Sequence, residues 1–167
     1  MKPLIQQFIF GLASILLVGS TSVLAQAPKT PNSAQQLLVF GDSLSAEYGI
    51  PRGTGWVQLL NKQLRKDGSS WQITNASISG ETTAGGLSRL PDLLKRIKPR
   101  LVIIELGAND ALRGLSLAAT QKNLKEMIGM SKKSGAEVLL VGMQIPPNYG
   151  QEYTKQFARL FVTLAQS

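Results

Sequence analysis

Three short clusters of small polar residues in this 167-residue chain carry the groups that acyl transfer requires. Residues 41–45 are Gly-Asp-Ser-Leu-Ser, residues 75–82 are Asn-Ala-Ser-Ile-Ser-Gly-Glu-Thr, and residues 107–110 are Gly-Ala-Asn-Asp. A serine hydroxyl, a glycine N–H and an asparagine amide from three such loops would supply a nucleophile and hydrogen-bond donors for an oxyanion. Together the clusters predict a serine-type acyl transfer site.

Each cluster also has a purely structural interpretation when it is taken alone. Asp42 or Ser43 could cap a following helix, and Gly80 could supply a turn with positive φ. Asn109 and Asp110 could form an Asx turn. Because such residues are the usual components of caps and turns, the functional hypothesis depends on the three clusters meeting in space.

Four apolar runs predict the strands that would bring the clusters together. Residues 36–40, 101–106 and 137–141 are nearly continuous apolar runs, as expected for strands covered on both faces of a parallel sheet, and residues 71–74 form a shorter run. Amphipathic helical patterns separate and follow these strands. The predicted apolar helix faces are Trp56, Leu59, Leu60 and Leu64; Leu87, Leu90, Leu94 and Ile97; Leu117, Leu124, Met127, Ile128 and Ser131; and Tyr153, Phe157, Leu160, Phe161 and Leu164.

The alternation of strands and helices predicts an α/β fold with a doubly wound parallel sheet and right-handed crossovers. In such sheets a ligand binds outside the carboxyl ends of the strands, where the strand order reverses. Each polar cluster follows one of the first three predicted strands. The predicted fold therefore places all three clusters at one edge of the sheet.

Residues 1–25 have the pattern of a secretory signal peptide, with Lys2 before an apolar core at residues 8–18 and small residues at Ala25. This core is shorter than the roughly 20 residues that span a bilayer, which argues against an uncleaved anchor. We expect cleavage after Ala25, a disordered lead-in at residues 26–34, and a periplasmic or secreted protein without a stable membrane anchor.

The composition excludes several classes of site. With neither Cys nor His in the chain, a disulfide framework, an iron–sulfur cluster and the usual zinc ligands are excluded, and we expect no metal and no cofactor. The net charge of +8 raises the alternative of a basic protein that binds a nucleic acid or a membrane surface. The basic residues are scattered and lack interleaved aromatic residues, so we expect no nucleic-acid partner. The oligomeric state is not predicted.

The three clusters resemble the first three sequence blocks of the SGNH (GDSL) hydrolases, through residues 41–45, 75–80 and 106–110. Residues 87–91, 112–114 and 147–150 are also similar to the bacterial periplasmic branch of thioesterases, lysophospholipases and arylesterases. The resemblance extends from about Leu37 to the last residue. It implies a flavodoxin-like sheet with the strand order 2-1-3-4-5.

Carried over to this chain, the resemblance implies that Ser43 is the nucleophile. The N–H groups of Ser43 and Gly80 and the side chain of Asn109 would form the oxyanion hole. The implied reaction is hydrolysis of a small acyl ester or thioester through an acyl-serine intermediate. The acyl chain and the leaving group of the substrate stay open.

One part of the family pattern is missing from these residues. Family members carry a histidine, preceded by an aspartate three positions earlier, after a fifth strand, and the chain contains no histidine. We expect residues 35–167 to form an incomplete SGNH hydrolase domain, with four of the five strands, that is inactive by itself. The alternative is a non-catalytic protein of the same fold that binds acyl ligands.

Three carboxylates near the clusters are weak replacements for the histidine. Glu47, Glu81 and Asp110 are close in sequence, but a carboxylate with a pKa near ~4 is a poor base for a serine hydroxyl. A lysine base is not indicated, because no Ser-x-x-Lys sequence occurs. We expect Asp42 to brace its own turn and Asp110 to stabilise the loop that presents Asn109.

Overall fold

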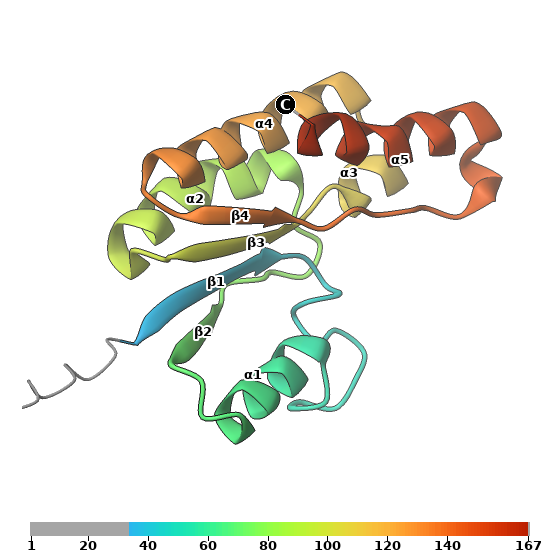
Figure 1. Ribbon diagram of the computed structural model, residues 1–167. Helices are drawn as coiled ribbons and strands as arrows, with labels where there is room; N and C mark the ends of the chain where they lie inside the picture. Colours follow the sequence, from blue (N-terminus) through green and yellow to red (C-terminus); the bar gives the residue numbers. More distant parts are fainter. Residues whose placement is uncertain (1–33, 167) are drawn as a thin grey trace, which may run out of the picture. The chain divides into compact units, whose positions relative to one another are not determined.

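Four strands form one parallel sheet in the computed structural model, which describes residues 34–166 (Figure 1). The strands are β1 (Gln35–Gly41), β2 (Trp71–Asn75), β3 (Leu101–Glu105) and β4 (Glu137–Leu140), in the order β2-β1-β3-β4. The predicted α/β fold with a parallel sheet is confirmed, and each predicted strand end lies within one residue of the observed end.

Four longer helices occupy the positions that the apolar patterns predict. They are α1 (Trp56–Lys66), α2 (Thr83–Ile97), α4 (Leu117–Lys133) and α5 (Gln151–Ala165). Two short elements were not predicted: α3 (Ala108–Leu112) and the 3₁₀ turn η1 (Pro147–Tyr149). Each is too short to show a helical period, and α3 places the Asn109-Asp110 pair in a helical turn rather than in a plain loop.

The helices divide between the two faces of the sheet (Figure 1). On the face covered by α2, α4 and α5, Phe40 and Ile104 belong to the larger buried core. On the opposite face, Val39 and Ile103 pack with Val57 of α1. Neighbouring residues of a strand are therefore buried on opposite sides, which explains why the strand sequences are continuously apolar.

The buried face of α1 differs from the predicted one. Val57 is buried, whereas Leu59 is 54% exposed and Trp56 is 37% exposed. Leu60 and Leu64, three and seven residues after Val57, are half-buried on the same side of the helix. Val57 packs against the sheet, whereas Trp56 lines a cavity at the carboxyl edge.

The predicted signal peptide, residues 1–25, and residues 26–33 of the predicted lead-in lie outside the described residues. Among residues 34–166, no helix is both long enough and apolar enough to cross a membrane.

The docking of α5 generates a stability prediction. Phe157 is fully buried and meets Phe161 edge to face, with ring centroids 5.2 Å apart. We expect Phe157→Ala to lower the free energy of unfolding by roughly 3–5 kcal/mol, because it leaves a cavity in the core. Val162→Ala, at an exposed position of the same helix, should change it by less than about 0.5 kcal/mol. Urea unfolding followed by circular dichroism measures both, and equal losses would contradict the packing described for α5.

Candidate active site

Ser43 lies in a tight turn that directly follows β1. The carboxylate of Asp42 is buried, and its Oδ1 accepts a hydrogen bond from the Leu44 N–H at 3.0 Å. The N–H of Ala46 donates to the carbonyl oxygen of Asp42 at 3.0 Å. The expectation that Asp42 braces its own turn is confirmed. A helix-cap role for Asp42 or Ser43 is wrong, because turns follow these residues and α1 begins only at Trp56.

Asn109 of α3, the element that follows β3, reaches the same carboxylate. Gly107 adopts a φ of +120°, a conformation that L side chains rarely adopt, and this turn directs the chain from β3 into α3. The Asn109 Nδ2 then donates to Asp42 Oδ2 at 3.0 Å. An amide nitrogen carries two hydrogens, so this bond orients the side chain and leaves the second hydrogen for another acceptor. Burial raises the pKa of Asp42, and the hydrogen bonds from Leu44 and Asn109 oppose this rise.

Asp110 joins the third cluster to Thr83, the residue that directly follows the second cluster. Its buried carboxylate accepts hydrogen bonds from the Thr83 N–H at 2.8 Å and from the Thr83 hydroxyl at 2.6 Å. The Thr120 hydroxyl of α4 lies 3.4 Å from the same group, and Asn123 donates to the Thr83 hydroxyl at 3.1 Å. The start of α2 is thereby fixed to α3 and α4, and the stabilising role expected of Asp110 is confirmed.

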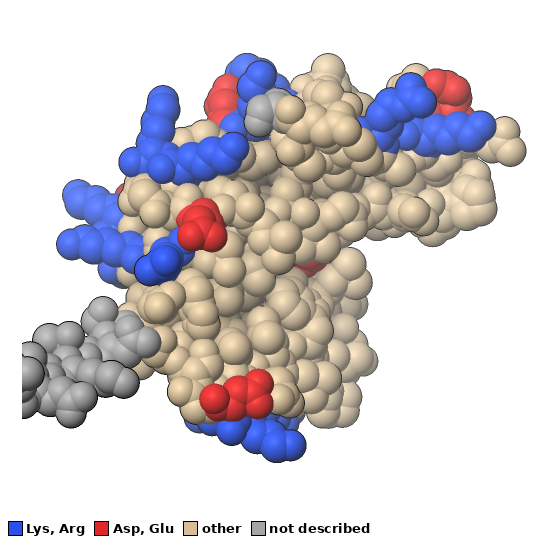
Figure 2. Space-filling model, in the orientation of Figure 1, with Lys and Arg blue, Asp and Glu red and all other residues tan. Residues whose placement is uncertain are grey.

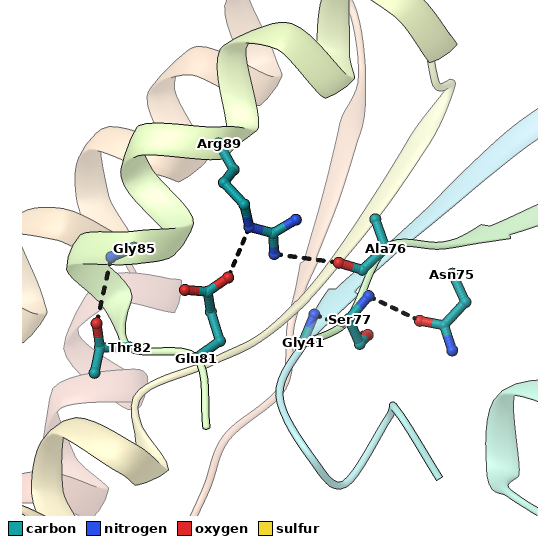
Figure 3. Close-up of polar contacts among 8 residues, drawn as sticks. All are labelled: Gly41, Asn75, Ala76, Ser77, Glu81, Thr82, Gly85 and Arg89. Carbon is teal, nitrogen blue, oxygen red and sulfur yellow. Dashed lines mark hydrogen bonds and ion pairs between the residues drawn. The ribbon is translucent and has the colours of Figure 1, made fainter. Parts of the chain in front are cut away.

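The loop between β2 and α2, which carries Gly80, is braced at both ends by Arg89 (Figure 3). The Arg89 Nε pairs with Glu81 Oε2 at 2.7 Å, and its Nη2 donates to the carbonyl oxygen of Ala76 at 3.2 Å. Arg113, which follows α3, donates to the carbonyl oxygen of Gly80 at 2.8 Å. The position of Gly80 is therefore set by side chains from α2 and from the end of α3.

The same loop is attached to the end of β1. The Gly41 N–H donates to the Ser77 hydroxyl at 3.1 Å, as Figure 3 shows, and the Ile78 N–H donates to the Gly41 carbonyl oxygen at 3.0 Å. Both bonds lie next to the Ser43 turn. The structure thus connects all three clusters at the carboxyl edge of the sheet.

A cavity of about 670 Å³ opens at this edge, between the segments that follow β1, β3 and β4. Ser43 and Asn109 line this cavity, whereas Gly80 does not and remains in the adjoining loop. Figure 2 shows a recess on the right of the molecule with acidic atoms at its base. The lining residues are Asp42, Ser43, Leu44, Trp56, Glu105, Ala108, Asn109, Leu112 and residues 141–146.

The carboxylates considered as replacements for the histidine are engaged elsewhere. Glu47 accepts hydrogen bonds from the N–H groups of Gly53 and Gly55, and these bonds lower its pKa. Glu81 forms the ion pair with Arg89. Within the described part of the chain, no group of three or more His, Cys, Asp or Glu residues could hold a metal ion.

Glu105 also lines the cavity, ends β3 and belongs to none of the three clusters. It is 4% exposed, and its Oε2 accepts a hydrogen bond from the Ser45 hydroxyl at 2.6 Å. Burial raises the pKa of Glu105 to about 7, and the nearby charge of Asp42 adds to this rise. A single acidic residue inside the apolar run 101–106 was the available signal, because a buried charge in a strand needs a specific partner.

Comparison with known proteins assigns the chain to a family. Residues 39–167 match the family described as GDSL-like Lipase/Acylhydrolase. The chain belongs to this GDSL (SGNH) family. The resemblance carried by the three clusters is confirmed.

Two curated relatives and one solved structure illustrate the similarity. Esterase TesA of Pseudomonas aeruginosa is 52% identical over 133 residues, which are 80% of this chain and 66% of TesA. Thioesterase 1/protease 1/lysophospholipase L1 of Escherichia coli is 42% identical over 80% of this chain and 63% of the relative. The chain thus spans about two thirds of the length of these relatives.

The solved structure is that of the psychrotrophic esterase EstA from Pseudoalteromonas, inhibited by monoethylphosphonate. It superposes with a TM-score of 0.76 at 42% identity, over 79% of this chain and 72% of that structure. The architecture of the described residues is therefore that of a GDSL-family hydrolase.

The Asp110 network generates a second prediction. Asp110→Ala removes the acceptor of a buried backbone N–H and of a buried hydroxyl, both of Thr83, and each unsatisfied group costs roughly 1–3 kcal/mol. We expect a clear loss of thermal stability in Asp110→Ala and almost none in Asp92→Ala, which alters an exposed carboxylate on α2. Differential scanning calorimetry distinguishes the two, and similar melting temperatures would contradict the structural role of Asp110.

Proposed function

We propose that this GDSL-family protein is a serine hydrolase that cleaves carboxylic esters or thioesters through an acyl-Ser43 intermediate. The observation that carries the proposal is the bond between Asn109 and Asp42. One carboxylate braces the turn of Ser43 and orients the amide of Asn109, and both residues line the same cavity. A nucleophile and an oxyanion donor on opposite sides of one carboxylate are suited to acyl transfer.

The proposed reaction has two steps. The Ser43 Oγ attacks the carbonyl carbon while a base accepts its proton, and the carbonyl oxygen becomes an oxyanion. The N–H groups of Ser43 and Gly80 and the free amide hydrogen of Asn109 donate to this oxyanion. The C–O or C–S bond then breaks, and the alcohol or thiol leaves with a proton. Water attacks the acyl-serine in the second step, which releases the carboxylic acid and restores the hydroxyl.

The lining of the cavity supports an acyl substrate. Leu44, Leu112, Met143 and Ile145 supply apolar surface beside Ser43. Apolar walls with a few polar groups at one end are typical of sites that hold a hydrocarbon chain next to a reactive group. The names of the two relatives, an esterase and a thioesterase/lysophospholipase, support the same substrate class.

The proposed mechanism requires a general base for Ser43, and the 167 residues include no histidine that could serve as one. Glu47 and Glu81 are held by other partners. The carboxyl group of Asp42 is held by the Leu44 N–H and the Asn109 amide, and that of Glu105 by the Ser45 hydroxyl. The chain by itself is therefore proposed to bind acyl groups without hydrolysing them efficiently. This composition also favours the second candidate function, a non-catalytic acyl-binding protein of the same fold.

Export is also part of the proposal. The positive residue, the apolar core at residues 8–18 and the small residues at Ala25 support a signal peptide. The proposed location is the periplasm or the extracellular medium.

Covalent labelling tests the nucleophile. We expect a fluorophosphonate to label residues 26–167 slowly, and to label quickly a fusion of these residues to a family C-terminal segment with its Asp-x-x-His block. Loss of the histidine from a serine–histidine pair costs up to ~10⁶ in kcat, because the hydroxyl then lacks a positioned base. Mass spectrometry of labelled peptides locates the adduct.

Ser43→Ala in both proteins is the control, and it should abolish the labelling. Rapid labelling of Ser43 in the unfused chain would show that another residue acts as the base. Labelling that survives Ser43→Ala would remove Ser43 from the proposed site. A fused protein that binds the probe's alkyl chain but never reacts would favour the non-catalytic alternative.

Asn109→Ala in the same fusion tests the oxyanion hole. We expect kcat for p-nitrophenyl esters to fall by ~10²–10³ with little change in KM, because the amide acts on charge that develops in the transition state. Asn148→Ala, at an exposed position of η1, is the matched control. An unchanged kcat in Asn109→Ala would exclude the amide from the site.

A further inference from the structure

Glu105, the last residue of β3, contacts the turn that contains Ser43. Its Oε2 accepts the Ser45 hydroxyl at 2.6 Å, and the Asp42 N–H points to the same oxygen at 3.4 Å. Asp42 and Ser45 stand on either side of the dipeptide Ser43-Leu44. One carboxyl group therefore holds the turn before and after the proposed nucleophile.

The backbone of β1 is adapted to this close approach. A Cβ placed on Gly41 would lie 2.5 Å from Glu105 Oε2 and 2.8 Å from the Ser45 Oγ. Any side chain at position 41 would displace the carboxyl or the hydroxyl. Glycine at this position thus leaves the space in which Glu105 and Ser45 meet.

Ser45 also connects Glu105 to a residue that lines the cavity. The Trp56 indole Nε1–H donates to the Ser45 Oγ at 3.1 Å, and Trp56 lines the cavity beside Ser43. The second oxygen of Glu105, Oε1, is buried and has no hydrogen-bond partner. A buried carboxyl oxygen without a partner is costly, so its retention next to the reactive turn calls for a functional explanation.

We propose that Glu105 is a positioning residue for the turn formed by residues 42–45. Acting through the Ser45 hydroxyl, its carboxyl group sets the positions of the Ser43 side chain and of the Trp56 side chain that lines the cavity. The proposal rests on the proposed function for the meaning of Ser43 as nucleophile. It concerns geometry, however, and is tested without catalysis.

The carboxyl also makes the turn sensitive to pH near neutrality. Glu105 titrates near pH 7, since burial raises its pKa. Below this pH the carboxyl is neutral, and above it the Ser45 hydroxyl bonds to a carboxylate, which accepts more strongly. Asp42 is the other ionisable residue of the cavity lining, to which α3 contributes only Ala108, Asn109 and Leu112. Asp110 of α3 instead bonds to Thr83, and Trp56 and residues 141–146 add uncharged side chains to the lining.

An NMR titration near neutral pH is simple to interpret in this chain. The chain has no histidine or cysteine that would titrate near pH 7, and it has only two tryptophans. We would record ¹H–¹⁵N NMR spectra of the chain between pH 5 and 9. The Trp56 indole and the Ser43 amide should shift along one curve with a midpoint near pH 7. The indole of Trp71, which lies at the start of β2, should not follow this curve.

Glu105→Gln should abolish the midpoint in both resonances and displace the Ser43 amide at all pH values. Glu137→Gln, at the exposed start of β4, is the matched control and should leave the wild-type curve unchanged. Ser45→Ala should uncouple the Trp56 indole from the titration and also displace the Ser43 amide. If Glu105→Gln does not fold, the spectra of Ser45→Ala test the proposal instead.

An unchanged midpoint in Glu105→Gln would overturn the proposal, as would a Ser43 amide that neither variant displaces. A flat Trp56 curve in the folded wild-type chain would do the same. Failure of fluorophosphonate labelling at Ser43 would instead refute the proposed function and leave these NMR results intact.

Discussion

The buried carboxylate of Asp42 joins the segments that directly follow β1 and β3. One oxygen accepts the Leu44 N–H and the other accepts the Asn109 amide. Burial raises the cost of losing either hydrogen bond, because a polar oxygen that is shielded from water must be paired with donors of the protein. The turn of Ser43 and the position of Asn109 are therefore set by one group, and displacement of Asp42 would disturb both.

Two further buried carboxyl groups, those of Asp110 and Glu105, extend this arrangement. Asp110 is satisfied by the backbone and hydroxyl of Thr83, so it connects α2 and α3 as a structural element. Glu105 is satisfied at one oxygen only. Burial raises the pKa of Glu105 to about 7, and the nearby charge of Asp42 adds to this rise.

Part of the positive charge lies at the C-terminal ends of helices. The last turns of α1, α2 and α4 each contain two basic residues, where they interact favourably with the helix dipole. Figure 2 shows much of the basic surface on the left, away from the recess with acidic atoms. These three helix ends hold six of the 18 Lys and Arg residues. The cavity has a largely apolar lining with two acidic residues.

The sequence by itself determined the strands, the longer helices and the residues at the carboxyl edge, because two-sided burial and helical periods leave direct patterns in apolar residues. It also indicated Ser43 and Asn109, since their clusters follow strands. It could not show that Leu59 is exposed, that Asn109 lies in a helical turn, or that Glu105 meets Ser45. Helix α3 is too short to show a helical period, and the exposure of Leu59 depends on how α1 packs. The contact of Glu105 with Ser45 depends on which strands are neighbours and how closely their ends approach. The contacts of Glu105 with Ser45 and of Asn109 with Asp42 join residues 60 and 67 positions apart, and no local pattern encodes them.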